Sequence, residues 1–167
     1  MATFIPIIVI VIGFALCYLC GSIPVGLIVG RLTRGVDIRE HGSGNVGTTN
    51  AIRILGLGPG IVVMCGDILK GVLGVLLMFW MLRLGDAWMA TIGSSASGIA
   101  LASGWVHDLA AALALVGVVL GHMFSPFMRF KGGKGIATAF GALCVVLPWS
   151  ALICLIIFAG LIAITRY

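Results

Sequence analysis

The sequence has very little charge. Of its 167 residues only 9% are Asp, Glu, Lys or Arg, and only five are acidic. A soluble domain carries roughly a quarter charged residues, so a water-soluble globule is excluded. Hydrophobic residues make up 61% of the chain, the mean hydropathy is +1.25, and several apolar runs approach the roughly 20 residues that cross a bilayer. The composition predicts an all-α polytopic membrane protein.

Several common catalytic and metal-binding motifs are absent from the sequence. There is no G-x-S-x-G and no H-E-x-x-H, and no His is followed five positions later by Asp. A Walker A motif is excluded because Met128 occupies its first glycine position and Gly135 follows Lys134. No internal repeat of the transporter kind is present. We therefore expect no metal site, no cofactor and no nucleotide hydrolysis.

The five cysteines all lie inside apolar runs, so they indicate nothing about an oxidising compartment. Cys17 and Cys20 form a C-x-x-C pair on an uninterrupted apolar segment. At this spacing on a helix, small packing residues are the favoured interpretation over a redox or metal pair.

Seven of the ten basic residues gather in two places, and these predict the topology. Arg31, Arg34, Arg39 and Arg53 lie in one polar stretch, and a second basic segment covers residues 129–135. The positive-inside rule places both in the cytoplasm and the N-terminus outside. Separate basic loops do not make the continuous basic face that nucleic acid requires, so an anionic lipid or a phosphorylated substrate fits better.

About five transmembrane helices are expected. The first covers residues 4–29, with a kink at the Gly-Ser-Ile-Pro of positions 21–24. The next two cover about 60–82 and 109–127. The run 136–164 is too long for one span, and Pro148 predicts its division into two tightly connected helices. Residues 88–105 are interpreted as an extracytoplasmic excursion, because a further span there would put the second basic segment outside.

The polar loop at residues 41–50 has the composition of a phosphate cradle. Its glycines let backbone N–H groups turn toward an anion, its Ser, Thr and Asn side chains add short donors, and Arg53 can add a bidentate charge. The alternative is an ordinary cytoplasmic turn, which favours the same residue types.

The segment 131–138 runs into the start of an apolar helix, where N–H groups and the helix dipole favour an anion. The alternative for Lys131 and Lys134 is a simple positive-inside anchor. Two such loops on one face suggest a reaction between two phosphorylated molecules, or a phosphorylated substrate held beside a lipid phosphate.

Three further ionisable residues lie within or at the ends of predicted spans. Asp67 and Lys70, at i and i+3, are candidates for substrate contact or for a structural ion pair. His122, at the cytoplasmic end of the third span, is a candidate base or phosphate donor, with a helix-terminal hydrogen bond to backbone as the alternative.

Together these segments resemble a known family. The matching residues are 42–50 (GSGNVGTTN) with Arg53, then 67–71 (DILKG), 121–126 (GHMFSP) and 130–138 (FKGGKGIAT), in order over nearly the whole chain. The chain is similar to the bacterial acyl-phosphate-dependent glycerol-3-phosphate acyltransferases. The resemblance implies a multi-pass enzyme of the bacterial inner membrane that moves a fatty acyl group from acyl phosphate to the 1-hydroxyl of glycerol 3-phosphate. The products are lysophosphatidic acid and phosphate, the first step of phospholipid synthesis.

The chain departs from the family pattern in two places. The family continues beyond position 167 with two further spans and a motif containing His, Asn and Glu, and the excursion 85–108 looks longer than usual. We therefore expect residues 1–167 to form a single transmembrane acyltransferase domain that is incomplete at its C-terminal end.

The residue patterns and the resemblance together give candidate roles. Ser43, Arg53 and His122 are the candidate catalytic residues. The candidate substrate-binding residues are Gly44, Asn45, Gly47, Thr49, Asn50, Asp67, Lys70, Lys131, Gly132, Gly133, Lys134 and Gly135. The first loop is expected to hold glycerol 3-phosphate and the second the acyl phosphate. A membrane carrier for an anionic phosphorylated metabolite is the rival function, and a non-catalytic lipid-binding scaffold is a third.

Overall fold

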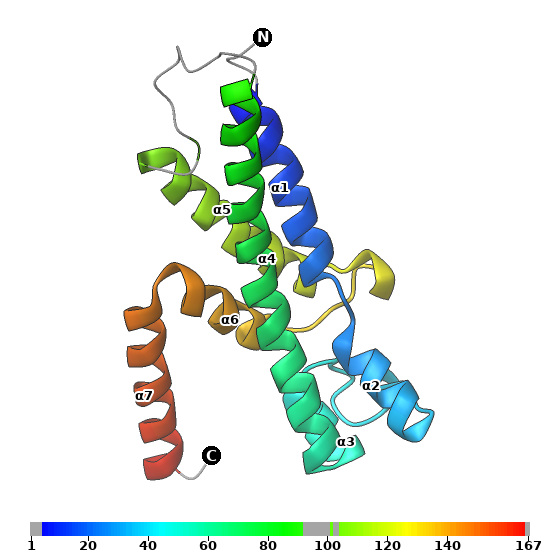
Figure 1. Cartoon of the computed structure of the whole chain (residues 1–167). Helices are drawn as coiled ribbons and strands as arrows, with labels where there is room; N and C mark the ends of the chain where they lie inside the picture. The colour runs from blue at the N-terminus through cyan, green and yellow to red at the C-terminus, as the bar shows by residue number, and fades with distance from the viewer. Residues whose placement is uncertain (1–4, 92–100, 102–103, 166–167) are drawn as a thin grey trace.

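The computed structural model describes residues 5–91, 101 and 104–165, and every regular element in this part of the chain is helical. Figure 1 shows the long helix α4 running the full height of the molecule with α1 beside it, and α2 and α3 around its lower end. The elements in chain order are α1 (Ile5–Gly21), α2 (Val25–Arg34), η2 (Ile38–Glu40), α3 (Thr48–Leu55), α4 (Leu57–Thr91), α5 (Gly104–Met123), η4 (Pro126–Met128), α6 (Ile136–Val146) and α7 (Pro148–Thr165).

Four helical segments of the described residues, not the predicted five, are long and apolar enough to cross a membrane. They are Ile5–Arg34, Leu57–Thr91, Gly104–Met128 and Pro148–Thr165. The predicted division of the last apolar run at Pro148 is confirmed, but it leaves α6 with only 11 residues. At 1.5 Å per residue α6 reaches about 16 Å, roughly half the hydrocarbon thickness. It is a half-length helix and not a span.

The predicted kink in the first span is a complete break between α1 and α2. Pro24 has no N–H to continue the helical hydrogen bonding, and α1 ends at Gly21 three residues before it. The chain resumes at Val25 as the amphipathic helix α2, which ends at Arg34 and is capped by Gly35 with a left-handed φ of 67°.

The second span extends further than predicted at both ends, since α4 has 35 residues and begins at Leu57. Trp88 belongs to its last turns and Trp105 to the first turn of α5. These two ends of the predicted excursion are therefore helical, whereas positions 92–100 and 102–103 of it lie outside the described residues.

Glycines permit the closest helix crossings. A Cβ atom at Gly21 would overlap the Val118 carbonyl of α5, so α1 and α5 meet backbone to backbone. A Cβ atom at Gly71 on α4 would overlap the Thr138 carbonyl of α6, and one at Gly141 would overlap the carbonyl of Ile68. Small residues allow membrane helices to approach in this way. These crossings and the packing of α5 against α4 and α6 bring residues 67–71, 121–122 and 138 together.

The cysteine pair packs against α4. The thiol of Cys17 donates to the Gly74 carbonyl at 3.1 Å, and that of Cys20 donates to the Lys70 carbonyl at 3.4 Å. Both thiols are free. This arrangement agrees with the packing interpretation of the C-x-x-C pair.

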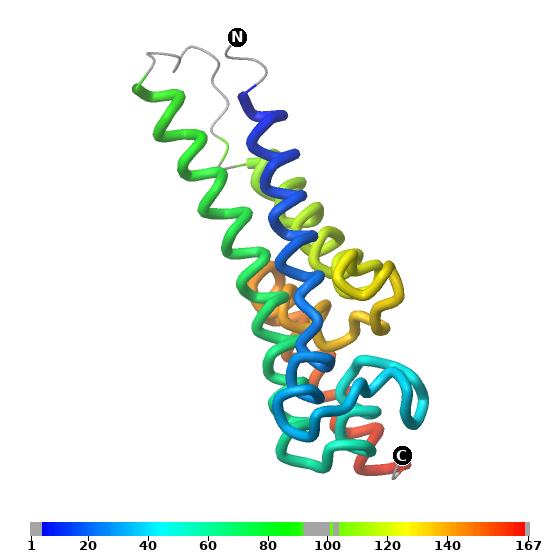
Figure 2. The backbone as a smooth tube through the Cα atoms, turned by 90° about the vertical axis from the view of Figure 1, so that its right-hand side faces the viewer, coloured from blue at the N-terminus to red at the C-terminus, as the bar shows by residue number. Residues whose placement is uncertain are grey.

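The last helix, α7, lies apart from the bundle and contacts it through α6. Ala151 is its one buried residue, and the apolar side chains along the rest of its length are exposed. The end of α7 and the beginning of α1 lie at opposite ends of the molecule (Figures 1 and 2).

Candidate active site

The break before Pro24 is the point where three parts of the molecule meet. Lys70 of α4 donates from Nζ to the carbonyl oxygen of Ile23 at 2.9 Å. Ser125, just after α5, donates from Oγ to the carbonyl oxygen of Ser22 at 2.6 Å. Backbone oxygens released by a broken helix in lipid need such partners. The break is thereby fastened both to α4 and to the segment that leads into the second basic loop.

Behind this junction lies a buried polar cluster of Asp67, Lys70, His122 and Thr138. Lys70 Nζ is 2.8 Å from Asp67 Oδ1, and both side chains are less than 5% exposed. His122 Nδ1 lies 3.6 Å from the same carboxylate oxygen and 3.2 Å from Thr138 Oγ1. A buried charge needs a partner, and here each charged group has one.

These contacts can be compared with the alternatives that the sequence left open for Asp67, Lys70 and His122. Asp67 and Lys70 form the ion pair that the sequence allowed. The ring of His122 faces side chains of α4 and α6, and not backbone at a helix end. Thr138 was named only as the last residue of a motif. Its contact with His122 depends on the packing of α6 against α5, which no local pattern reveals.

The last three residues of the predicted loop 41–50 begin α3, which leaves residues 41–47 as the first loop, and Asn50 on α3 organises it. This side chain is 2% exposed, accepts from Ser43 N through Oδ1 at 3.0 Å, and donates through Nδ2 to the carbonyls of Ile38, His41 and Asn45. Its amide is fully engaged within the loop, so Asn50 positions the loop.

Three polar side chains of the first loop and of α3, which follows it, face outward. Ser43, Thr49 and Arg53 are exposed, and Asn45 accepts from the N–H of Gly47 at 3.0 Å. Gly44 adopts a left-handed φ of 70°, which favours glycine. The loop and α3 together therefore present two hydroxyls and a guanidinium at the surface, the groups that the phosphate-cradle interpretation uses.

The loop is preceded by a tight Asp37–Arg39 pair at η2. Arg39 donates from Nε to Asp37 Oδ1 at 3.0 Å and from Nη2 to Oδ2 at 2.6 Å, the bidentate geometry of a strong pair. The hydrogen bonds from Arg39 lower the pKa of the Asp37 carboxyl to about 2. This pair was not singled out from the sequence, although an Asp-x-Arg spacing beside a Gly-rich loop is a usable signal.

In the second loop the backbone donors are used differently from the prediction. Gly132 N donates to the Met123 carbonyl at 2.9 Å, and Gly133 N donates to the His122 carbonyl at 3.2 Å. A Cβ atom at Gly133 would overlap His122 Nε2. These two glycines therefore seal the loop against the end of α5. The donors left for an anion are those of Lys134, Gly135 and the first turn of α6.

One cluster of buried side chains joins the first loop to η4, the turn that precedes the second loop. The cluster contains residues from α2, η2, the first loop, α3, α4 and η4, namely Leu27, Val29, Ile38, Val46, Ala51, Leu55, Val63 and Met128. Figure 2 shows the two loops on the same side of the molecule. Lys131 and Lys134 are exposed, as is Arg53. The structure thus places the two predicted anion loops on one side of the molecule, with the polar cluster of Asp67 next to the second loop.

Comparisons with known proteins agree on one family. A family model described as glycerol-3-phosphate acyltransferase matches residues 11–167. The glycerol-3-phosphate acyltransferase of Bacillus subtilis (strain 168) is 43% identical over 153 residues, which are 91% of this chain and 66% of that protein. That of Geobacter sulfurreducens is 42% identical, over 92% of this chain and 66% of that protein. The chain spans about two thirds of the length of these relatives.

Solved structures show the same relationship. The chain is similar to the crystal structure of PlsY (YgiH), an integral membrane glycerol 3-phosphate acyltransferase, in its glycerol 3-phosphate form. The TM-score is 0.66 at 34% identity, covering 97% of this chain and 66% of that one. The lysophosphatidic acid form gives a TM-score of 0.67 at 33% identity, with 92% and 64% covered. The chain is therefore a membrane protein that belongs to the glycerol-3-phosphate acyltransferase family.

Proposed function

We propose that this chain transfers a fatty acyl group from acyl phosphate to the 1-hydroxyl of glycerol 3-phosphate, giving lysophosphatidic acid and inorganic phosphate. The observation that carries the proposal is the placement of two glycine-rich loops on the same side of the molecule, with the buried polar cluster of Asp67, Lys70 and His122 against the second loop. Two loops of this kind suit two phosphate-bearing substrates. Similarity to proteins named for the same activity supports the assignment.

The first loop is proposed to hold glycerol 3-phosphate. Arg53 supplies the charge, and the hydroxyls of Ser43 and Thr49 supply short donors, all three being exposed. Asn45 and Asn50 hold the backbone of the loop in the shape that presents them. Asn50 thus acts through position and not by touching substrate.

The second loop is proposed to hold the acyl phosphate. Lys131 and Lys134 neutralise its charge, while Gly135 and the start of α6 offer N–H groups to its oxygens. Gly132 and Gly133 contribute the loop's shape. Asp67 and Lys70 support the loop through His122. The ring of His122 lies beside Asp67, and its backbone carbonyl accepts a hydrogen bond from Gly133 N.

The proposed reaction is a direct displacement at the acyl carbon. The 1-hydroxyl oxygen bonds to the carbonyl carbon, the bond from that carbon to the phosphate oxygen breaks, and phosphate leaves with the electron pair. An acyl phosphate is a mixed anhydride, so positioning and charge neutralisation provide most of the acceleration. The hydroxyl proton goes to a substrate phosphate oxygen, whose second pKa is near 6, or to His122.

The proposal includes an orientation. Basic residues flank both loops, and the positive-inside bias assigns this end of the molecule to the cytoplasm of a bacterial inner membrane, with the N-terminus outside. Glycerol 3-phosphate is water-soluble and meets the first loop there, while the acyl chain of the second substrate lies among the membrane helices.

The test is a phosphate-release assay on the purified chain in lipid mesophase. Palmitoyl phosphate is supplied with or without glycerol 3-phosphate, and lysophosphatidic acid is followed by mass spectrometry. Phosphate release that requires glycerol 3-phosphate and matches the lipid product is expected, and Arg53→Ala should abolish it. Absence of product, both from this chain and from a version extended with the remaining third of a relative, would overturn the proposal. Uptake of glycerol 3-phosphate into vesicles without acylation would indicate a carrier.

A further inference from the structure

Thr138, the third residue of α6, lies between the second loop and the buried polar cluster. Its backbone N–H belongs to the first turn of α6, where N–H groups have no partner within the helix. Its side chain is fully buried, and Oγ1 lies 3.2 Å from Nδ1 of His122. The close crossing at Gly71 of α4 fixes the backbone of Thr138 in this position. Thr138 therefore links the start of α6 to the imidazole of His122.

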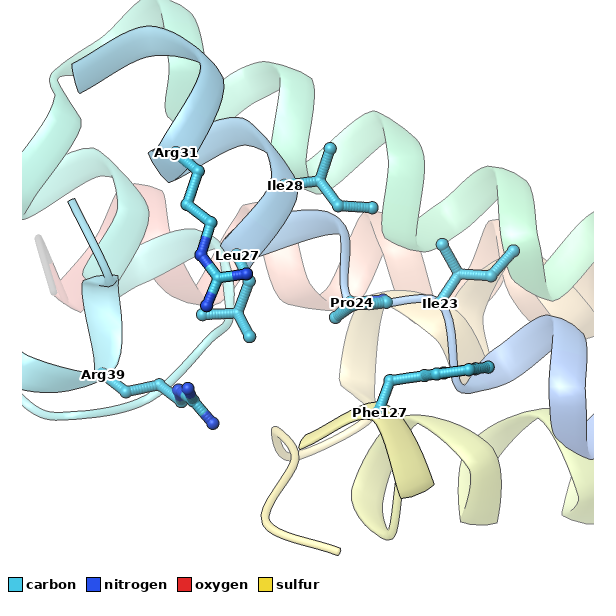
Figure 3. A pocket seen from close by; sticks show the side chains of 7 residues that line it. All are labelled: Ile23, Pro24, Leu27, Ile28, Arg31, Arg39 and Phe127. Carbon is cyan, nitrogen blue, oxygen red and sulfur yellow. The ribbon is translucent and has the colours of Figure 1, made fainter. Parts of the chain in front are cut away.

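The polar cluster is separated from a pocket at the break between α1 and α2. This pocket, of about 390 Å³, lies between α2, η2 and η4, and Figure 3 shows Ile23 and Phe127 among the side chains around it. The side chain of Ile23 lines the pocket, whereas its carbonyl oxygen accepts from Lys70 of the cluster. The cluster residues themselves do not line the pocket. The pocket therefore brings no water to the contact between Thr138 and His122.

The hydroxyl proton of Thr138 has a single acceptor. Within the described part of the chain, the side chain of Thr138 has no hydrogen-bond partner other than Nδ1 of His122. A buried O–H group without an acceptor costs its full desolvation penalty. Asp67 does not bind Nδ1 instead, because its Oδ1 lies 3.6 Å from that nitrogen and already accepts from Lys70 at 2.8 Å. Thr138 therefore donates to Nδ1, and Nδ1 carries no proton.

The charges of the cluster favour a neutral ring. Asp67 and Lys70 compensate each other, and both side chains are buried. A protonated His122 would add a second buried cation without a second carboxylate in the cluster to pair with it. A neutral imidazole whose Nδ1 is an acceptor has its proton on Nε2.

We propose that Thr138 is a positioning residue that holds His122 in the Nε2–H tautomer, with this N–H directed at the second loop. A Cβ atom at Gly133 would overlap Nε2, so the glycine leaves that nitrogen uncovered by a side chain. In the proposed function, the acyl phosphate lies in this loop, and Nε2–H donates to one of its phosphate oxygens. That last step rests on the proposed function, whereas the tautomer does not. Thr138 acts only through His122.

The test is ¹⁵N NMR of the purified chain labelled at its histidine rings, because the shifts of the two ring nitrogens report which one carries the proton. His122→Ala identifies the His122 signals among those of the three histidines. Thr138→Val removes the hydroxyl and keeps the shape, Thr138→Ala removes it without bulk should valine disturb folding, and Thr138→Ser retains it. Thr165→Val is the matched control, since that hydroxyl donates only to the Leu161 carbonyl.

We expect the Nε2–H tautomer in the natural chain, in Thr138→Ser and in the control. In Thr138→Val and Thr138→Ala the proton should move toward Nδ1, because the carboxylate of Asp67 then faces that nitrogen without a competing donor. The value of kcat/KM for palmitoyl phosphate should fall roughly tenfold in these two variants, with KM for glycerol 3-phosphate unchanged, and Thr138→Ser should restore it.

Two results would overturn the role of Thr138. One is a proton on Nδ1 in the natural chain, which would leave Nε2 free to accept a proton. The other is the same tautomer in the natural chain and in both variants without the hydroxyl. Because the tautomer is measured without turnover, a chain that is inactive even when extended but shows the expected shifts would overturn the proposed function and leave this inference standing.

Discussion

The ammonium of Lys70 lies 2.8 Å from the carboxylate of Asp67 and 2.9 Å from the carbonyl oxygen of Ile23. One buried ammonium therefore pairs with a carboxylate on its own helix, α4, and donates to a backbone oxygen at the break between α1 and α2. His122 approaches the same carboxylate from α5. The helices that carry the two loops are thus joined through one pair of charges.

Replacing Lys70 alone should be severely destabilising. Lys70→Met leaves the carboxylate of Asp67 buried without its ammonium and removes the donor from the Ile23 carbonyl. Breaking a buried pair from one side costs about 3–5 kcal/mol. The double variant Asp67→Asn with Lys70→Met removes both charges and should lose less. Thermal unfolding in one detergent measures both, and Arg83→Gln on the exposed face of α4 is the control. A double variant less stable than Lys70→Met would contradict this account.

The crossing of α4 and α6 predicts a contrast between two glycines of one helix. Gly71→Ala places a methyl group against the Thr138 backbone carbonyl, whereas Gly58→Ala meets nothing within 4 Å. Overpacking of this kind costs about 1–3 kcal/mol, while Ala in an open helical position is neutral or stabilising. A lower unfolding temperature and lower activity are expected for Gly71→Ala alone. Equal unfolding temperatures and activities of the two variants would mean that α4 and α6 move apart to accommodate the methyl group at little cost.

Local rules predicted the breaks in the helices correctly. Pro24 and Pro148 each remove a backbone donor, and the structure changes direction beside both. The number of spans was wrong, because hydropathy measures the length of an apolar run and not that of each helix within it. Pro148 divides the last run into 11 and 18 residues, and only the longer piece can cross a membrane.

The sequence predicted which residues make up the candidate site, but it did not predict which acceptor each backbone N–H group would bond. The two basic loops were identified from their glycines and polar residues, and they lie on the same side of the molecule (Figure 2). The engagement of Gly132 and Gly133 with carbonyls of α5 depends on the turn at Arg129 and Phe130, both of which have a positive φ. Residues other than glycine rarely adopt that conformation, so no sequence rule predicts the turn.

The Asp37–Arg39 pair predicts a pH dependence with a definite sign. The pKa of Asp37 is lowered from 3.8 to about 2 in the folded chain, so the folded state holds its proton less tightly than the unfolded state does. The stabilisation is complete above about pH 4 and is lost as the pH falls toward 2. The difference in unfolding temperature between the natural chain and Asp37→Asn should shrink over that range. A difference that stays constant down to pH 2 would show that the pair adds nothing to stability.

The assignment of substrates to loops predicts opposite effects of two basic residues on KM. Lys134→Ala should raise KM for palmitoyl phosphate far more than KM for glycerol 3-phosphate, and Arg53→Lys should do the reverse. Hydrogen bonds to charged groups contribute about 1.5–3 kcal/mol, which corresponds to changes of roughly 10- to 150-fold. Arg83→Ala, at the other end of α4, controls for loss of charge. The opposite ordering would mean that the first loop holds the acyl phosphate and the second holds glycerol 3-phosphate.

The packing of Gly133 on His122 yields a prediction that distinguishes two roles of His122, support of the second loop and proton transfer. Gly133→Ala pushes a methyl group onto Nε2 of a ring whose Nδ1 side already faces Asp67 and Thr138, so the ring cannot retreat. We expect a lower unfolding temperature for Gly133→Ala and a recovery when His122→Ala is added, with a coupling energy of about 1–3 kcal/mol.

Additive effects of the two substitutions would show that the contact does not determine stability. Activity of His122→Ala alone, measured in the same preparations, then decides the role of the imidazole. Full retained turnover would identify His122 as a support for the second loop and leave a substrate phosphate as the base. A fall in kcat that changes the pH profile without changing the unfolding temperature would assign the proton to His122 Nε2, because only that nitrogen faces the loop.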